Sequence, residues 1–510
     1  MSSYRRTTIR AVGKARLGGT VLEHQCKQDG HSHGEASAGE QQGVPRRAAL
    51  KAGAALATGG ADGLLAGAAV AEQRAPAVLT GKQAGRKFRA WVQEGLWVGG
   101  KAGVEELRLK ELQSRQVVVR TEASAPCYSL VQRGIGGRPA VKPAPKYAPD
   151  TVPQISNHTA VGIVEAVATD VRRVKPGDRV IIGVVSQCGN CYMCLRGRAD
   201  HCQWAFAVPA GFPPEIATRA DGSGLIAQIG IGGLAELNVC YEEYLCPIFT
   251  DLPADQLSLL GDTAATGFGG AMGVMKVEMG SNVVVLGAGP VGLSAVMAAR
   301  VAGAAQIIVS EPVKHRREAA KRFGATTVLD PNAEGEGLVE TIRELCKGPT
   351  GRITSGGRGW VSQADSDFVN ATFGAVRDNR GPDFTIEAAG PTGDVPKVET
   401  PPDPTGILPM QQAWEMTRRG GEIVYLGFGQ IGDVSYPAAA FANAGRTVHA
   451  GQQGGLNFMR DIPKIVSLME QGKYDLRPMV TSRWRLEETN KAFQVASDRT
   501  ELAPVVVFDS

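Results

Sequence analysis

The stretch that decides the fold of this chain is Val283-Val284-Val285-Leu286-Gly287-Ala288-Gly289-Pro290-Val291-Gly292. Its first four residues form an uninterrupted apolar run, which predicts a short strand buried on both faces. The glycines that follow have the spacing G-x-G-x-x-G, and each has a physical task. Gly287 permits a tight turn, Gly289 lets a diphosphate approach the backbone, and Gly292 allows a helix to pack closely on the strand. The stretch therefore predicts a dinucleotide-binding strand–turn–helix unit, and the alternative is the same turn without a ligand.

The residues beyond this turn alternate between helix-like and strand-like patterns. We expect helices at 290–303, 313–323 and 409–419, and strands at 306–310, 383–388 and 422–426. This alternation predicts a parallel sheet with right-handed crossovers, and so a doubly wound α/β domain. Stretches rich in glycine, serine and proline at 348–381 and 391–408 are predicted to be insertions on its loops.

Glu311 follows the second of these strands, where an acidic side chain would accept hydrogen bonds from both hydroxyls of an adenosine ribose. A carboxylate at this point repels the 2′-phosphate of NADP, so we expect NAD as the cofactor. Lys314, Arg316 and Arg317 come soon afterwards in the sequence and act against that preference.

Before residue 260 the pattern is of β type. Apolar or alternating runs predict strands at 87–92, 116–120, 161–167 and 179–185. These runs are closely spaced and separated by glycine and proline turns, which favours a small barrel or sandwich over further strand–helix–strand units. The sequence therefore predicts two parts of different architecture.

Four cysteines stand close together with the spacing C-x2-C-x2-C-x7-C, namely Cys188, Cys191, Cys194 and Cys202. Four thiolates this close can surround one Zn²⁺ ion in a closed tetrahedral site, which is a structural arrangement. The alternatives are two disulfides, an iron–sulfur cluster or independent buried thiols, although the short C-x2-C spacing strains a disulfide. We therefore expect a structural zinc ion. The remaining cysteines carry no motif: Cys26, Cys240, Cys246 and Cys346.

Together, the glycine-rich turn and the cysteine run resemble the zinc-dependent medium-chain dehydrogenases, the family of the zinc alcohol dehydrogenases. The resemblance extends from about residue 86 to residue 510. Segment 117–129 looks like the family's strand leading into its catalytic cysteine, and 157–165 looks like its Gly-His-Glu segment. Segment 260–267 looks like the one that supplies the third metal ligand.

This resemblance implies a GroES-like, β-rich catalytic domain at 86–261 and 454–510, with a structural zinc lobe at 186–204. It implies a Rossmann NAD-binding domain at 262–453, and an active site in the cleft between the two domains. A homo-oligomer, either a dimer or a tetramer built by edge pairing of the Rossmann sheets, is implied as well.

Carried over position by position, the resemblance implies that Cys127, His158 and Asp262 hold a catalytic zinc ion in addition to the structural one. Many members have cysteine in the third place, whereas some bacterial alcohol and formaldehyde dehydrogenases have aspartate. Three protein ligands leave one coordination position for a substrate oxygen. Zinc would stabilise the alkoxide as the alcohol loses its proton, Ser129 would begin the proton relay, and hydride would pass to the nicotinamide.

Three positions depart from the family's pattern. Tyr128 replaces a basic residue or histidine near the pyrophosphate, Leu130 replaces an aspartate that steadies the zinc-binding histidine, and Thr159 replaces a glutamate behind the metal. Loss of such a carboxylate can cost about 10–100-fold in metal affinity or activity. A catalytically silent zinc- and nucleotide-binding protein is therefore an alternative to an enzyme.

Residues 1–71 are predicted to be a leader rather than part of the fold. Residues 1–44 are polar and without hydrophobic periodicity. They are followed by Arg46-Arg47, then by a weakly apolar stretch, and then by Ala69-Val70-Ala71. This order resembles a twin-arginine export signal and predicts a periplasmic or secreted protein moved by the twin-arginine translocase. The alternative is an alanine-rich surface helix in a cytoplasmic protein. Because free NAD is scarce outside the cytoplasm and this route moves folded proteins, an exported enzyme would carry tightly bound NAD.

The composition excludes several other classes of protein. Among the 510 residues, 43% are hydrophobic and 21% are charged, which is ordinary for a globular chain of two or three domains. No long, strongly apolar run predicts a membrane span, and no basic run with interleaved aromatic residues predicts a nucleic-acid partner. We therefore expect a small-molecule partner, an alcohol or an aldehyde. Aldehyde oxidation or dismutation in the same fold is the main alternative to alcohol oxidation.

Overall fold

The computed structural model describes residues 83–94, 102–134, 153–204, 213–347, 380–392, 396–429 and 432–509. The predicted leader and most of the predicted insertion at 348–381 lie outside these described residues. All of the described residues belong to one compact unit, Gln73–Ser510. None of the described helices is long and apolar enough to cross a membrane.

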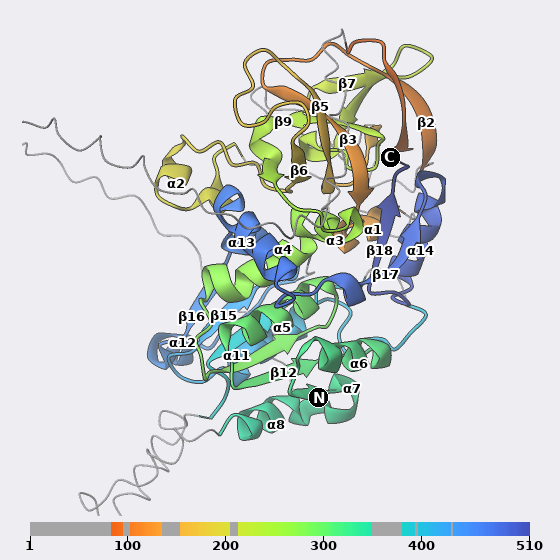
Figure 1. Cartoon of the computed structure of the whole chain (residues 1–510). Helices are drawn as coiled ribbons and strands as arrows, with labels where there is room; N and C mark the ends of the chain where they lie inside the picture. The colour runs from red at the N-terminus through yellow and green to blue at the C-terminus, as the bar shows by residue number, and fades with distance from the viewer. Residues whose placement is uncertain are drawn as a thin grey trace, which may run out of the picture. The chain divides into compact units, whose positions relative to one another are not determined.

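A six-stranded parallel sheet contains the strand that precedes the glycine-rich turn (Figure 1). Across the sheet the order is β13 (Thr327–Leu329), β12 (Gln306–Ser310), β11 (Asn282–Leu286), β14 (Phe384–Glu387), β15 (Glu422–Tyr425) and β16 (Thr447–Ala450). The chain therefore builds outward from β11 in one direction and then returns to build outward from β14 in the other. Open α/β sheets bind ligands at such a switch point, beyond the carboxyl ends of the strands.

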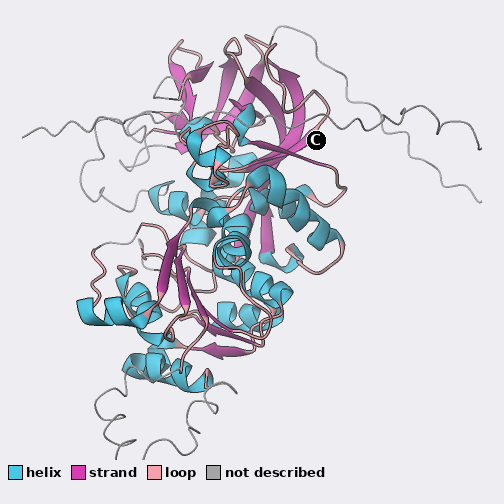
Figure 2. Cartoon of the chain, turned by 90° about the vertical axis from the view of Figure 1, so that its left-hand side faces the viewer, coloured by secondary structure: helices cyan, strands magenta, loops and turns pink. Residues whose placement is uncertain are grey.

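Alternate residues of β11 show how helices cover both faces of this sheet. Val283 and Val285 belong to one apolar cluster with Leu293 of helix α5 (Pro290–Ala302). Val284 belongs to a second cluster with side chains of α8 (Leu338–Leu345) and α11 (Ile407–Met416). Figure 2 shows the helices on both sides of the strands. The sheet is therefore doubly wound, as the sequence predicts.

The remaining helices lie in both parts of the protein. They are α1 (Tyr128–Gly134), α2 (Tyr192–Leu195), α3 (Ala254–Leu257), α4 (Thr263–Gly269), α6 (Lys314–Phe323), α7 (Pro331–Glu334), α12 (Ala438–Ala444), α13 (Phe458–Glu470) and α14 (Thr489–Ser497).

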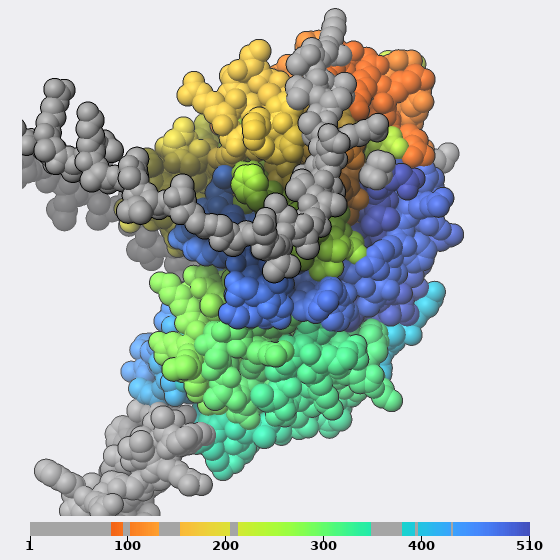
Figure 3. All heavy atoms as spheres, viewed as in Figure 1, coloured from red at the N-terminus to blue at the C-terminus, as the bar shows by residue number. Residues whose placement is uncertain are grey.

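The remaining described strands form a closed barrel and a seven-stranded sheet. The barrel contains β1 (Lys87–Gln93), β2 (Ala102–Leu109), β7 (Glu215–Thr218), β8 (Gly224–Ala227) and β4 (Gln154–Ile155). The sheet contains β10 (Leu245–Ile248), β6 (Arg179–Ile182), β5 (Ala160–Val167), β3 (Gln116–Ser124), β18 (Ala503–Val507), β17 (Val480–Trp484) and β9 (Leu237–Tyr241). Because β18 pairs with β3, the C-terminal strand joins the sheet that contains the early described strand β3. In Figure 3 these C-terminal residues form a blue band between the orange and yellow surface above and the green surface below.

The predicted strands and helices are present, and most of their ends agree within one residue, but the strand predicted at 116–120 continues to Ser124. The strand predicted at 179–185 ends at Ile182. The next residue, Gly183, lies so close to the ring of Phe458 that an added β-carbon would be 2.5 Å from it. The helix predicted at 409–419 begins at Ile407 and ends at Met416. It ends there because Thr417 takes an extended conformation, with its hydroxyl bonded to a carbonyl one turn earlier.

Candidate active site and metal centres

A cavity of about 740 Å³ opens where the parallel sheet meets the β-rich part. Gly287, after β11, and Ala388, after β14, line it from the switch point of the sheet. Cys127, His158 and Leu502 line it from the β-rich part. The cavity therefore lies where an open α/β sheet binds its ligand, and the second part of the protein supplies the opposite wall.

The three residues expected to hold a catalytic zinc ion come together in this wall. Cys127 lies between β3 and α1, His158 lies between β4 and β5, and Asp262 immediately precedes α4. One ligand atom from each lies within 4.8 Å of the other two. Nε2 of His158 is 3.0 Å from Oδ2 of Asp262. Three distant segments of the chain thus present a thiol, an imidazole and a carboxylate to one point.

Asn157, which the sequence analysis did not single out, joins two of these segments. Its side-chain amide donates to Oγ of Ser124 at 2.7 Å and to the carbonyl of Ala125 at 3.0 Å. Its amide oxygen accepts from the backbone N–H of Cys127 at 3.4 Å. Asn157 has a φ of +72°, which asparagine tolerates better than most residues do. These bonds set the position of Cys127 relative to the adjacent His158.

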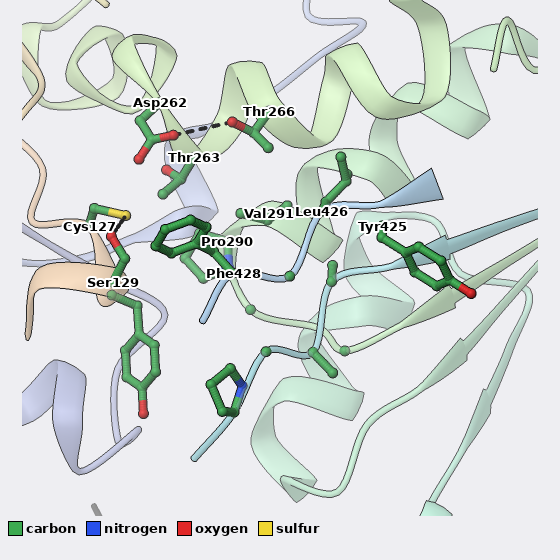
Figure 4. A pocket seen from close by; sticks show the side chains of 18 of the residues that line it. Cys127, Ser129, Asp262, Thr263, Thr266, Pro290, Val291, Tyr425, Leu426 and Phe428 are labelled. Carbon is green, nitrogen blue, oxygen red and sulfur yellow. Dashed lines mark hydrogen bonds between the residues drawn. The ribbon is translucent and has the colours of Figure 1, made fainter. Parts of the chain in front are cut away.

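Asp262 is held by two further side chains that the sequence analysis missed. The hydroxyl of Thr266 donates to Oδ1 of Asp262 at 3.2 Å, one helical turn away (Figure 4). The side-chain amide of Gln453 donates to the carbonyl of Gly261 at 2.6 Å, directly before Asp262. Both the carboxylate and the backbone that carries it are therefore fixed.

The departures at Leu130 and Thr159 are visible in the structure. Leu130 is 2% exposed and lines the cavity, so it packs but forms no polar contact with His158. The hydroxyl of Thr159 donates to the carbonyl of Ser258 at 2.9 Å, in the turn that precedes Asp262. Among the described residues, Asp262 is the carboxylate in contact with His158.

The electrostatics of this trio suit a metal cation. Burial, together with the carboxylate of Asp262, raises the pKa of Cys127 well above its ordinary value. Burial also acts to raise the pKa of Asp262, but hydrogen bonds from His158 and Cys127 hold it below its usual range. Thiolate, imidazole and carboxylate are all zinc ligands, and a thiol loses its proton as the metal binds. The residues present therefore fit a zinc ion with three protein ligands.

Ser129, the expected start of a proton relay, lies in the first turn of α1 and lines the same cavity. Its Oγ is 3.1 Å from Sγ of Cys127, as the dashed line in Figure 4 marks. A hydroxyl therefore stands directly beside the metal donors, at a place from which it can exchange a proton with a bound alcohol.

The glycine-rich turn has the geometry that its spacing predicts. Gly287 has a φ of +95°, and a β-carbon on Gly292 would lie 1.9 Å from the carbonyl oxygen of Gly287. A β-carbon on Gly289 would meet a single atom within 4 Å, Nη1 of Arg316 at 3.9 Å. The packing of the protein therefore requires glycine at the first and third positions. At Gly289 it leaves open space beside the cavity.

Glu311 is buried beside this turn and also lines the cavity. One carboxylate oxygen accepts the backbone N–H of Ala288 at 2.6 Å, and the other accepts that of Val313 at 2.9 Å. The carboxylate thus braces the glycine-rich loop, a task that the sequence analysis did not foresee. Each carboxylate oxygen can accept a further bond, so the expected contact with a ribose stays possible.

The four cysteines of the second predicted metal site converge in a small lobe around α2, with all their sulfur atoms within 4.8 Å of one another. Each is a free thiol, as are the other described cysteines. Burial opposes ionisation of Cys191, but amide hydrogen bonds from Cys194 and Gln203 lower its pKa to about 6. Four converging thiols, one of them readily ionised, suit a structural zinc ion rather than the two disulfides that the spacing also allowed.

Other residues also line the cavity, most of which the sequence did not single out. Pro401, Pro402 and Asp403 belong to the stretch 391–408, which the sequence predicts to be an insertion on a loop. Arg316 and Arg499 bring two guanidinium groups to the same cavity, one from each part of the protein. Neither residue has a motif of its own around it.

Two family models match parts of the chain that contribute residues to this site. The alcohol dehydrogenase GroES-like domain matches residues 113–250, and the zinc-binding dehydrogenase domain matches residues 290–392. Together they support the zinc-dependent medium-chain alcohol dehydrogenase family for this chain, whose members are oxidoreductases that act on alcohols. The predicted GroES-like and Rossmann architecture is confirmed.

Curated relatives agree. The chain is 28% identical over 362 residues to an alcohol dehydrogenase class-3 of Caenorhabditis elegans, an alignment that covers 70% of this chain and 83% of the relative. It is 26% identical over 399 residues to the S-(hydroxymethyl)glutathione dehydrogenase of Saccharomyces cerevisiae, covering 77% and 89%.

Solved structures share the fold. An alcohol dehydrogenase zinc-binding domain protein from Burkholderia ambifaria matches with a TM-score of 0.67 and 24% identity, covering 83% of this chain and 100% of that one. Benzyl alcohol dehydrogenase from Acinetobacter calcoaceticus matches with a TM-score of 0.65 and 23% identity over the same shares.

Proposed function

We propose that this protein is a zinc-dependent alcohol dehydrogenase that transfers hydride between an alcohol–carbonyl pair and NAD. One observation carries the proposal. The trio of Cys127, His158 and Asp262 and the glycine-rich turn at Gly287 line the same cavity, so a metal and a dinucleotide would meet in it.

In this proposal each residue has a defined task. Zinc, when bound, would supply a Lewis acid for the substrate oxygen, and NAD would supply the hydride acceptor. Cys127, His158 and Asp262 hold the metal, and Thr266 keeps the carboxylate of Asp262 in place. Ser129 would take up the hydroxyl proton of the alcohol at Oγ while it passes its own proton on, which is the first step of a proton relay. The apolar share of the cavity wall, which includes Leu130, keeps water away from the reacting atoms.

NAD is proposed in preference to NADP because of Glu311. Its carboxylate is buried beside the glycine-rich turn, where it would repel a 2′-phosphate. The four cysteines of the α2 lobe would hold a second, structural zinc ion.

Aldehyde chemistry is the second candidate within the same fold. It is favoured by the name of the yeast relative, S-(hydroxymethyl)glutathione dehydrogenase, and by the aspartate in the third ligand position. Turnover of an aldehyde without added NAD would identify an aldehyde dismutase, because such an enzyme regenerates its own cofactor.

A silent zinc- and nucleotide-binding protein is the candidate of a different class, motivated by Leu130 and Thr159. Against it stands the support that Asn157, Thr266 and Gln453 give to the metal ligands. A protein with no use for the metal would have no reason to keep its ligands so well fixed.

We further propose export by the twin-arginine route, with NAD bound before transport and retained afterwards. The proposal rests on the order of residues in 1–71, and a cytoplasmic enzyme with exchanging NAD is its alternative. A homo-oligomer is proposed as well. Strand β16 lies at the end of the parallel sheet, with its residues largely exposed, and so offers an edge for pairing.

The experiment that tests the central proposal is the metal and nucleotide content of one sample of purified mature protein. Two zinc ions and one NAD per chain, followed by oxidation of a panel of alcohols, is the expected result. One zinc ion and no nucleotide, with no turnover of alcohols or aldehydes after zinc and NAD are added, would contradict it in favour of the silent protein. Mature protein that begins close to residue 72 would support export, whereas full-length protein confined to the cytoplasm would exclude it.

A further inference from the structure

Arg499 is a buried residue with a strained backbone on the wall of the cavity. It is 6% exposed, and it has a φ of +58° just after α14, where glycine would fit without strain. Strained non-glycine residues persist where the surrounding structure holds them, and they concentrate at functional sites. The position therefore suggests that the arginine side chain has a use.

The described neighbours of this guanidinium do not neutralise its charge. Its Nε donates to the hydroxyl of Tyr128 at 3.2 Å, and its Nη2 donates to Oγ1 of Thr392 at 2.9 Å. The guanidinium carbon lies 5.4 Å from the centre of the Tyr128 ring. These partners are neutral, and no described carboxylate lies within ion-pair distance of Arg499. A buried guanidinium without a counter-charge among its described neighbours is unfavourable, so this position favours the binding of an anion.

Arg316, on α6, brings a second guanidinium to the same cavity. Its Nε has no partner among the described residues, and its Nη2 makes one long contact of 3.5 Å with the carbonyl of Glu501. Burial lowers the pKa of Arg316, the carboxylate of Glu311 opposes this, and the positive charge of Arg499 adds to the lowering. Two guanidinium groups thus repel each other beside a cavity, and one of them has an unused donor.

The place where they meet is the glycine-rich turn. Nη1 of Arg316 lies 3.9 Å from the position that a β-carbon on Gly289 would take, in the space that the packing leaves open. The turn also opens α5, whose first N–H groups have no side-chain cap and favour an anion. We propose that Arg316 and Arg499 together bind the diphosphate of the dinucleotide at this turn, a role that rests on the proposed function.

This proposal also explains the role of Tyr128, which holds the guanidinium of Arg499. Where the family has a basic residue or histidine, this chain has a phenol that accepts a hydrogen bond from Arg499 and stacks beside it. The positive charge lost at one position is supplied from the C-terminal end of α14. Since Arg499 belongs to the β-rich part and Arg316 to the parallel-sheet part, the diphosphate links the two parts when it binds.

The test uses the mature protein freed of bound nucleotide, and calorimetric titration with NAD, ADP, adenosine and inorganic pyrophosphate. Arg499→Gly removes the charge and relieves the strained φ, and Arg316→Gln removes the second charge. Arg477→Gln is the matched control, because this arginine is 72% exposed and pairs only with Asp475 in the described structure. Thermal unfolding of each variant without ligand is measured alongside.

The expected result is that Arg499→Gly and Arg316→Gln each weaken binding of NAD, ADP and pyrophosphate by about 10–100-fold, the usual value of a charge-assisted hydrogen bond. Adenosine binding stays unchanged, and Arg499→Gly unfolds at the wild-type temperature or above. Wild-type affinity for NAD and ADP in both variants would overturn the proposal. So would an equal loss for adenosine, or a lower unfolding temperature together with loss of every ligand, since either result indicates a structural role.

The wild-type protein separates this proposal from the proposed function. If it binds pyrophosphate and ADP but not NAD, with the losses expected in the variants, the anion site stands and the NAD-dependent function fails. If it binds NAD and both variants retain that affinity, the function stands and the anion site fails. If it binds none of the four compounds, both are wrong.

Discussion

Glu387 gives a prediction whose size and sign follow from the structure. This carboxyl group stands at the end of β14, fully buried, and accepts backbone N–H groups of Ala389 at 2.7 Å and of Gly390 and Gly427 at 3.3 Å. Burial outweighs these donors and raises its pKa from 4.5 to about 7. The phenol of Tyr425 lies near enough for the two groups to interact. The loops after β14 and β15, whose backbone N–H groups bond to Glu387, line the cavity.

The sign of the pH effect on stability follows from the pKa of Glu387 in the folded and in the unfolded protein. The folded protein holds the proton of Glu387 up to about pH 7, whereas the unfolded chain releases it near pH 4.5. Between these values the folded state binds more protons, so the free energy of unfolding falls as the pH rises. At about 1.4 kcal/mol for each unit of pKa, the raised value costs about 3 kcal/mol of stability above pH 7.

The perturbation is Glu387→Gln, which removes the titration and keeps one acceptor oxygen. Urea unfolding, followed by tryptophan fluorescence, is measured at pH 5, 6, 7 and 8 for the wild type, this variant and Glu336→Gln, an exposed control. The variant loses some stability at every pH, because its amide N–H₂ must face a backbone donor. The difference between wild type and variant should shift by about 2–3 kcal/mol in favour of the variant between pH 5 and pH 8. A difference that stays constant within about 0.5 kcal/mol, as for the control, would refute the reasoning.

Three further predictions concern the two metal sites and the turn. Gly292→Ala should lower the free energy of unfolding by about 1–3 kcal/mol or more, because its methyl group would lie 1.9 Å from the carbonyl oxygen of Gly287. Thermal unfolding checks this against Gly337→Ala, where a β-carbon meets nothing within 4 Å and the change should be small. Asp262→Ala and Cys191→Ser should each remove one of two zinc ions, but different ones, so mass spectrometric metal analysis should find one per chain in each and none in the double variant. Thr266→Val should weaken zinc binding at the trio by about 10-fold or more, measured by competition with a chelator, and Thr266→Ser should restore it.

The parts of the site that the sequence predicted are those encoded locally. The turn at 287–292 and the cysteine run at 188–202 each fix their own geometry within a few residues, so spacing alone indicates the chemistry. The trio could be predicted only through resemblance to a family. Cys127, His158 and Asp262 come from three segments, and no spacing rule brings these segments together.

What could not be predicted depends on tertiary approach. Arg499 carries no motif. Its proposed role depends on the burial of its guanidinium and on its hydrogen bond to Tyr128, which is distant in sequence. The strained φ of Asn157 likewise exists only in the folded chain. Glu311 was predicted as a ribose ligand because of its place after a strand. Its hold on the loop depends on how closely the backbone of Ala288 approaches it.

The departures from the family's pattern share a physical logic. Each removes a charged group that would act from one particular position: a base at Tyr128, and carboxylates at Leu130 and Thr159. At Tyr128 the structure brings a positive charge from another segment, whereas at Leu130 and Thr159 it brings His158 no carboxylate besides Asp262 among the described residues. A buried guanidinium at Arg499 lies against the phenol, and neutral donors such as Thr266 hold the metal ligand. A hydroxyl steadies a carboxylate without adding charge, which suits a site where the third ligand is itself an anion, because a further carboxylate would repel it. The three departures therefore leave Asp262 as the described carboxylate in contact with His158, held in place by the neutral hydroxyl of Thr266.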